Sequence, residues 1–334
     1  MALTQEQYKQ QAEEAQRLGW IASNQGSLAF DAQSVTSTYA NSGIPSFLAN
    51  YIDPRVIDIQ IAPTKAAQIL GETQKGNWTT VSAQFMTVEP TGEVASYGDF
   101  STNGMASANV NFPTRESYHY QLFTKYGQKE LEMYGLANLN WKDQLDKATA
   151  LALNKFQNTS YFFGISGLKN YGLLNDASLS SALTPTAQWS LVGTAADVIA
   201  DDIRRIFNKL VLQSKGYIDN SSSMVLALSP SASTTLLKTN SYNVNVMDIL
   251  KKNYPNLRIE TAPEYLSSGG VESVQLIAEG LDGIETATCG FTEKMRAHQL
   301  VPHPSGSAWS LKKSQGTWGA IIFRPFLIAQ MAGV

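Results

Sequence analysis

Residues 141–163 constrain the fold of this 334-residue chain most, because their pattern predicts one uninterrupted helix. Mostly apolar or small side chains recur at steps of three and four, namely Trp141, Leu145, Ala148, Ala152, Phe156, Thr159 and Phe163. Asn140 is a predicted N-cap, Asp143 stands at the third helical position, and Gly164 is of the type that commonly ends helices. At about 1.5 Å per residue the helix is roughly 35 Å long, and we expect its apolar stripe to face the core.

The opposite side of this helix carries charges at a spacing of four. Lys142 with Asp146, and Asp143 with Lys147, are therefore expected to form two surface ion pairs. Each such pair stabilises a helix by only about 0.2–0.5 kcal/mol.

A long insertion without helical periodicity precedes the helix. Residues 77–88 alternate enough to predict a strand, and residues 118–126 predict another, with Tyr118, Tyr120, Leu122 and Thr124 on one face. Between these strands lie residues 89–116, which contain three glycines and two prolines. Excursions of this length are uncommon inside a compact domain. We expect a two-stranded loop that projects from the body.

The second half of the chain predicts an α/β-like module. Predicted helices cover residues 195–215, 230–237 and 246–253, and predicted strands cover 224–228, 258–261 and 273–278. The run 317–329 is apolar enough to be a buried last strand, which we expect to return to the first module. The fold class expected is therefore α+β.

Composition excludes several classes of protein. One cysteine, Cys289, rules out a disulfide framework, and with only His119, His298 and His303 a zinc site is not expected. A net charge of −3 is not the basic signature of a sequence-reading nucleic-acid binder. No segment has the roughly 20 apolar residues of a membrane helix. Charged residues make up only 16 %, whereas Ser, Thr, Asn and Gln number 98, so a polar but nearly neutral surface is expected.

Motifs of catalysis are missing from the sequence. No nucleophile elbow, phosphate loop, dinucleotide fingerprint or helical zinc pair occurs. Two groups of polar residues are considered as candidate sites. Asp197, Asp201 and Asp202 could bind a metal, and Glu293, His298 and His303 could form an acid/base set. The first is interpreted as a solvated helix face and the second as ordinary polar residues. We therefore expect no enzyme activity, no cofactor and no metal.

The first 43 residues are interpreted as an arm. Residues 4–18 predict a thin amphipathic helix, and residues 19–43 are too apolar for a free linker and too irregular for a packed element. An extended arm on another surface is preferred to a tail that is ordered only locally. Trp is enriched at the centres of interfaces. The candidate inter-subunit contacts, in the arm and the projecting loop, are Trp20, Phe30, Trp78, Tyr97, Phe100 and Arg115.

The order of these parts resembles the major capsid proteins of tailed bacteriophages, which have the Hong Kong 97 fold shared with encapsulins. Three stretches carry the resemblance over residues 44–334: Ile52-Asp-Pro-Arg-Val-Ile-Asp58 with Ala62-Pro-Thr-Lys-Ala66, Gly164 through Asn170-Tyr-Gly-Leu-Leu-Asn175, and Gly316-Thr-Trp-Gly-Ala through Arg324-Pro-Phe-Leu-Ile-Ala-Gln-Met-Ala-Gly-Val334. None of these stretches is catalytic.

The resemblance implies a domain organisation. Residues 1–43 would be the N-terminal arm and residues 77–115 the extended loop, which lies over a neighbouring subunit. The peripheral domain would comprise residues 44–76, residues 116–190 with the spine helix, and the returning residues 303–334. Residues 191–302 would form the axial domain.

The resemblance also implies a function. The chain would self-assemble as hexamers and pentamers into an icosahedral shell that encloses double-stranded DNA, in the virion and, during assembly, in the host cytoplasm. Expected partners are further copies of the chain, a portal protein, separate scaffolding or decoration proteins, and packaged DNA, but no membrane. A subunit that touches several copies of itself benefits from neutral polar contacts, because like charges repel across repeated interfaces.

Three expectations concern variations within this family. No lysine occurs between Lys75 and Lys125, so covalent crosslinking through a loop lysine is not expected. About forty residues precede the recognisable domain, so neither a fused scaffold nor its cleavage is expected. Residues 1–115 carry six basic and ten acidic side chains, so contact with DNA should be loose and independent of sequence.

Two other functions stay open at this stage. The first is an encapsulin-type nanocompartment shell with an enzyme cargo, which has the same fold. The second is a soluble α+β enzyme that uses Glu293 and the nearby histidines.

Overall fold

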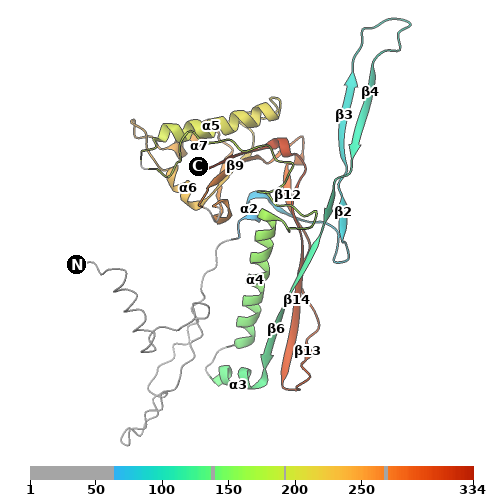
Figure 1. Cartoon of the computed structure of the whole chain (residues 1–334), viewed down its shortest axis with the longest axis vertical. Coiled ribbons are helices and arrows are strands. Elements are labelled where there is room, and N and C mark those ends of the chain that lie inside the picture. Colours follow the sequence, from blue (N-terminus) through green and yellow to red (C-terminus); the bar gives the residue numbers. More distant parts are fainter. Residues whose placement is uncertain (1–63, 137–139, 192, 267–269) are drawn as a thin grey trace, which may run out of the picture. The chain divides into compact units, whose positions relative to one another are not determined.

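The computed structural model of the chain describes residues 64–136, 140–191, 193–266 and 270–334. Contacts divide the chain into residues 1–53 and 54–334, and all described residues lie in the second unit. The predicted arm, with its helix at 4–18, lies outside the described residues. The mixture of helices and strands confirms the expected α+β class (Figure 1).

A five-stranded sheet combines strands from the beginning and the end of the described unit. Its strands are β1 (Glu72–Gln74), β6 (Tyr118–Gly127), β12 (Ala287–Ala297), β13 (Val301–Pro302) and β14 (Ala308–Ile322). The long strand β14 is central, because it pairs antiparallel with β6, β12 and β13. The helix α4 (Trp141–Phe163) packs along β6 and β14 (Figure 1). Strands distant in sequence therefore hold the long helix.

The bounds predicted for the long helix are confirmed. The Asn140 side chain accepts a hydrogen bond from the Asp143 N–H at 3.4 Å, as an N-cap does. At the other end the Gly164 N–H donates to the Ser160 carbonyl at 2.8 Å, and Gly164 has a φ of +63°. A shorter helix, α3 (Gln128–Leu136), precedes α4.

The side of α4 that faces the sheet is not the side predicted. Its buried residues include Thr149, Leu153, Gln157 and Ser160, whereas the predicted stripe residues Ala148, Ala152, Phe156, Thr159 and Phe163 are exposed. The sheet presents polar side chains to the helix, and these bind the polar side of α4. Periodicity therefore located the helix correctly, but Phe156 and Phe163 of the predicted stripe lie outward, whereas Tyr161 and Phe162 are buried in an apolar core.

The expected ion pairs on α4 are also corrected. Asp146 forms an ion pair with Lys313 on β14, with 2.7 Å between Oδ1 and Nζ, instead of pairing with Lys142. No ion pair between Asp143 and Lys147 is found among the described residues. Lys313 is largely buried, and burial strengthens its need for a charged partner.

A four-stranded sheet forms the α/β module, as expected. Its order is β15 (Ile328–Ala332), β9 (Ser273–Ala278), β7 (Met224–Leu228) and β8 (Leu257–Thr261). Three helices accompany it, namely α5 (Ala196–Gln213), α6 (Pro230–Thr235) and α7 (Val246–Asn253). Ser229 caps α6 by accepting from the Ala232 N–H at 2.9 Å. Ile199, Ile203, Ile206 and Leu210 of α5 are buried in the core of this module.

The predicted last strand, residues 317–329, is divided between the two sheets. Residues 317–322 continue β14 in the five-stranded sheet, and a 3-10 turn, η3 (Pro325–Leu327), follows. The final strand β15 pairs with β9 in the α/β module, so the chain does not end in the first module as expected.

The projecting loop is a two-stranded hairpin, as predicted. Strands β3 (Thr87–Glu93) and β4 (Met105–Asn111) pair with each other, and β2 (Ser82–Gln84) pairs with β5 (Thr114–Glu116) below them (Figure 1). The predicted strand at 77–88 is therefore shorter, because residues 77–80 form a hydrogen-bonded turn. The remaining short elements are α2 (Ala66–Leu70), η2 (Pro263–Tyr265), β10 (Gly280–Leu281) and β11 (Ile284–Glu285).

Replacement of Gly164 by alanine should destabilise the chain. A Cβ at Gly164 would lie 2.7 Å from the Tyr171 Cα, at a positive φ, whereas a Cβ at Gly167 meets no atom within 4 Å at a similar φ. We expect Gly164→Ala to lower the free energy of unfolding by at least about 2 kcal/mol more than the control Gly167→Ala. Denaturant unfolding of the unassembled chain measures the difference, and equal losses would contradict this account.

Candidate assembly surfaces

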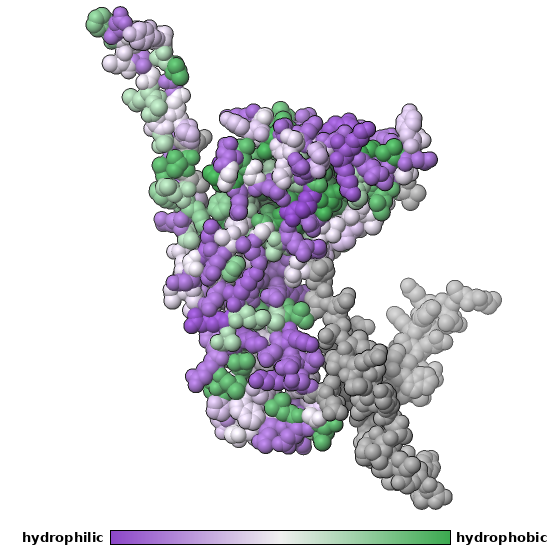
Figure 2. Space-filling model, turned by 180° about the vertical axis from the view of Figure 1, so that it is seen from behind, coloured by the Kyte–Doolittle hydropathy of each residue, from purple (hydrophilic) through white to green (hydrophobic). Residues whose placement is uncertain are grey.

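The hairpin β3–β4 has one apolar and one polar face. Side chains alternate along paired strands, so the register of Val88 with Val110 places Val88, Pro90, Ala106, Ala108 and Val110 on one face. The opposite face carries Glu93, Met105, Ser107 and Asn109. All of these residues are exposed, including those of the apolar face. Figure 2 shows the hydrophobic residues along this hairpin. The hairpin thus presents an apolar surface that the described part of the chain leaves uncovered.

The tip of the hairpin exposes two aromatic rings. Phe100 is fully exposed, and Tyr97 is exposed to 92 %, with its hydroxyl donating to Asp99 Oδ1 at 2.8 Å. Large apolar side chains on a surface commonly mark interaction sites when they are grouped. Both residues were candidate contacts from the sequence, and their exposure is compatible with that role.

Trp78 lies at the base of the hairpin among polar side chains. Its ring centroid is 4.6 Å from that of His119 and 6.0 Å from that of His298, and the Arg296 guanidinium lies 5.4 Å from it. A cavity of about 440 Å³ beside it is lined by Gln74, Asn77, Trp78, Thr79, Thr292, Glu293 and Arg296. Burial lowers the pKa of His119, and the nearby charge of Glu293 opposes that shift.

Arg115 anchors the base of the hairpin within the chain. Its guanidinium pairs with Asp176 at 2.6 Å and lies 4.6 Å from the ring centroid of Tyr171. Both charged side chains are nearly buried. This contact ties β5 to the segment that follows α4. A role for Arg115 in contacts between subunits stays a prediction, as it does for Trp78, Tyr97 and Phe100.

Trp20 and Phe30, the two remaining candidates, lie outside the described residues.

The exposed apolar side chains of α4 were not predicted to be a surface, because the sequence pattern assigned them to the core. The signal was present in the spacing of Ala148, Ala152 and Phe156.

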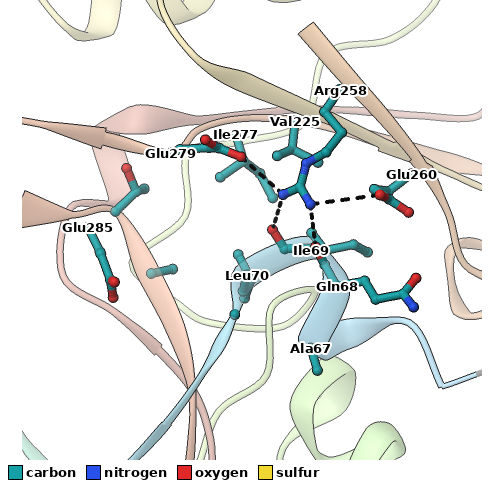
Figure 3. A pocket seen from close by; sticks show the side chains of 13 residues that line it. Ala67, Gln68, Ile69, Leu70, Val225, Arg258, Glu260, Ile277, Glu279 and Glu285 are labelled. Carbon is teal, nitrogen blue, oxygen red and sulfur yellow. Dashed lines mark hydrogen bonds and ion pairs between the residues drawn. The ribbon is translucent and has the colours of Figure 1, made fainter. Parts of the chain in front are cut away.

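A cavity of about 620 Å³ lies beside α2 and the sheet of the α/β module. Figure 3 shows Arg258 directed at the end of α2, where its guanidinium donates to the carbonyls of Gln68 at 2.8 Å and Ile69 at 3.4 Å. The same group binds Glu279 at 3.0 Å and lies 3.8 Å from Glu260. Arg258 therefore fastens α2 to strand β8, and its hydrogen-bonding capacity is used for that contact.

The three residues of the candidate acid/base set, Glu293, His298 and His303, have separate partners. Glu293 pairs with Arg296 at 3.2 Å, His298 Nε2 lies 2.6 Å from Ser314 Oγ, and His303 Nδ1 lies 3.1 Å from Ser305 Oγ. Within the described ranges no hydrogen bond or ion pair joins Glu293, His298 and His303 to one another.

Burial raises the pKa of the Cys289 thiol well above its usual value, which keeps the thiol protonated and unreactive.

The aspartates of α5 differ from one another. Asp201 pairs with Arg204 on the surface, as a solvated residue does. Asp202 is buried, which corrects the expectation for it, and it accepts from the Thr186 N–H at 3.0 Å, the Trp189 Nε1 at 3.1 Å and the Arg205 guanidinium at 2.9 Å. Its carboxylate joins α5 to the preceding loop.

In the part of the chain that is described, no three His, Cys, Asp or Glu side chains converge as metal ligands. No helix there has the length and apolarity to cross a bilayer.

Three solved structures have folds similar to this one. The capsid of Myoviridae phage XM1 matches with a TM-score of 0.74 at 13 % identity, covering 88 % of this chain and 100 % of that chain. The capsid of the native GTA particle matches at 0.62 with 12 % identity (89 % and 99 %), and a Mycobacterium phage Ogopogo chain at 0.57 with 11 % identity (86 % and 98 %). Comparison with curated proteins gives no match. The fold is therefore the Hong Kong 97-type capsid fold.

A protein family described as Pa193 gp26 major capsid protein matches residues 35–333. The chain belongs to this family and is a major capsid protein of the tailed-phage type, as its sequence predicted. It is accordingly a virion component that assembles into multimeric shells. The uncovered apolar surfaces are consistent with a subunit that is stabilised by its neighbours.

Loss of the Arg115 side chain should destabilise the unassembled chain. Removing one partner of a buried ion pair costs about 3–5 kcal/mol because the other charge stays buried without compensation. We expect Arg115→Ala to approach this loss in a denaturant titration.

The exposed pair of Arg204 with Asp201 supplies the control. Since exposed pairs contribute about 0–1 kcal/mol, Arg204→Ala should change the unfolding free energy by less than about 1 kcal/mol. A similar small change for Arg115→Ala would show that the Asp176 contact is not a structural anchor.

Proposed function

We propose that the chain forms hexamers and pentamers that close into an icosahedral shell around the double-stranded DNA of a tailed phage. The observation that carries this proposal is the exposed apolar face of β3–β4. A two-stranded hairpin is marginally stable in water and needs a third strand or a packed helix for stability. Among the described residues, β3 and β4 pair only with each other. A neighbouring copy is the partner that a shell of identical subunits supplies.

Several weak contacts for each subunit are sufficient for a stable shell. Linked contacts add because each one raises the effective concentration for the next. The hairpin, its aromatic tip and the arm would supply such contacts, with Trp20, Phe30, Trp78, Tyr97, Phe100 and Arg115 as candidates. The proposed domains are an arm at 1–43, an extended loop at 77–115 and an axial domain at 191–302, to which strand β15 adds.

The other partners follow from the same proposal. A portal protein would occupy one vertex, and separate scaffolding or decoration proteins would act on the shell during assembly in the host cytoplasm. Contact with packaged DNA would be loose, since the chain carries a net charge of −3 and tight binding requires many Lys and Arg contacts to phosphates.

We also propose that the chain is not an enzyme. Its ionisable residues that resembled a site are each engaged in structural contacts, as described for Glu293, His298 and Asp202. The buried thiol of Cys289 lies 3.7 Å from the Ala66 carbonyl and is protonated.

Size-exclusion chromatography followed by electron microscopy of the expressed chain tests the proposal. We expect capsomers or closed shells of uniform diameter. A stable monomer with catalytic turnover would contradict it. Shells that enclose an enzyme in place of DNA in the native host would favour the nanocompartment alternative.

Truncation of the tip aromatic Phe100 should impair assembly without destabilising the subunit. The ring is fully exposed, so Phe100→Ser removes no contact within the described chain. We expect Phe100→Ser to lower particle yield by about tenfold or more, corresponding to at least 1.4 kcal/mol per contact. The control Phe100→Leu keeps an apolar side chain and should assemble much better than Phe100→Ser. Equal yields for all three chains would remove Phe100 from the interface.

A further inference from the structure

The tip of the hairpin contains an Asn-Gly pair, Asn103-Gly104, which is the only such pair in the sequence. Both residues lie in the segment that joins β3 to β4, directly before Met105, and both are exposed. Asparagine is chemically labile, and it reacts fastest where glycine follows, because glycine lets the next main-chain nitrogen approach the side-chain carbon most freely. The tip therefore holds the dipeptide of this chain that is best suited to spontaneous deamidation.

The glycine of this pair is required by the turn. Gly104 has a φ of +92°, in the left-handed region that favours glycine. A Cβ at this position would lie 3.3 Å from the Ala95 nitrogen and 3.4 Å from the Glu93 carbonyl oxygen. Any other residue would strain the turn that closes the hairpin. The fold itself thus supplies the neighbour that makes Asn103 reactive.

The reacting groups are unengaged within the described chain. No hydrogen bond is found there for the Gly104 N–H or for the Asn103 carboxamide, although the Asn103 N–H donates to Ser101 Oγ at 3.4 Å. The attacking nitrogen and the side-chain carbon are therefore free to come into contact on an exposed turn.

Asn220 supplies a contrast within the same chain. It is exposed, and a small residue, Ser221, follows it. The Ser221 N–H, however, donates to Asp219 Oδ1 at 3.0 Å, and Ser221 carries a Cβ. The nitrogen that would have to attack is held by another acceptor, so Asn220 should be much less reactive than Asn103.

Deamidation would change the charge of the tip. Residues 87–111 contain Glu89, Glu93 and Asp99 but no Lys or Arg. A further carboxylate at Asn103 would stand in the same turn as Phe100, whose ring is fully exposed. Burial of a charge costs more free energy than burial of a neutral amide. A carboxylate there would therefore oppose burial of the tip against another surface.

We propose that Asn103 of the unassembled chain deamidates through a succinimide closed by Gly104, and that the carboxylate formed makes the chain less competent to assemble. The second part of this inference rests on the proposed shell function. The first part concerns the chemistry of the chain alone.

The reaction needs water as its only co-reactant. The Gly104 nitrogen gives its proton to solvent and attacks Asn103 Cγ, so that a C–N bond forms. The bond from Cγ to Nδ2 breaks, and Nδ2 takes a proton from water and leaves as ammonia. Water then opens the ring. Opening at Cγ gives aspartate, whereas opening at the main-chain carbonyl gives isoaspartate, and neither step involves oxidation or reduction.

Peptide mapping by mass spectrometry of the full-length, unassembled chain during storage tests the chemistry. We expect the Asn103 peptide to show replacement of NH2 by OH at least about tenfold faster than the Asn220 peptide, because glycine follows only Asn103. The rate should rise with pH, since the attacking nitrogen must lose its proton, and enzymatic methylation should detect isoaspartate.

The matched variant Asn103→Gln should show neither change at this position, because glutamine must close a larger ring. Modification of Asn103 no faster than that of Asn220 would overturn the inference.

Assembly of a stored, partly modified sample tests the second part. We expect the modified form to be depleted from particles by about threefold or more relative to the subunits left in solution. The variant Asn103→Asp carries the product charge from the start, and its particle yield should fall below that of Asn103→Ser. Equal incorporation of the two forms, or equal yields for the two variants, would overturn the second part.

The two failures are distinguishable from failure of the proposed function. If fresh, unmodified chain forms no particles, the proposed function fails and the second part fails with it. The deamidation of Asn103 is measured without assembly, so the peptide map alone decides the first part.

Discussion

The hydrogen-bonded layer between α4 and the five-stranded sheet is the contact on which the rest of the structure depends. Thr149 Oγ1 lies 2.8 Å from Thr124 Oγ1, Ser160 Oγ lies 2.8 Å from Thr317 Oγ1, and Asp146 pairs with Lys313. The Gln315 amide donates to Gln157 at the centre of the layer. Buried polar groups are costly when unpaired, so this layer holds the helix in one register on β6 and β14.

The polar layer also determines what the surface can do. Because the polar residues Thr149, Gln157 and Ser160 face the sheet, Phe156 and Phe163 of α4 are left outward. The hairpin β3–β4 likewise presents an apolar face that the described chain does not cover. A protein that exposes such surfaces is a poor isolated monomer and a suitable building block, because burial of apolar area stabilises association. The membership in a major capsid protein family agrees with this reasoning.

Local sequence signals predicted most elements of the fold. The cap at Asn140, the end at Gly164 and the hairpin near residues 89–116 all follow from neighbouring residues. Contacts between distant segments were not predictable in this way. The sequence of α4 does not reveal that β14 presents Gln315 and Thr317, so the buried side was assigned incorrectly. The aromatic tip was identified as a candidate surface, whereas the outward side of α4 was not, because Ala148, Ala152 and Phe156 matched the pattern of a core.

Hydrogen–deuterium exchange, compared between unassembled subunits and particles, tests the central claim that neighbouring copies cover the hairpin. An isolated hairpin opens often, so its amides exchange rapidly unless a partner protects them. We predict that residues 87–111 exchange at least about tenfold more slowly in particles, while the core strand β7 changes little. Equal exchange of residues 87–111 in the two states would contradict the account.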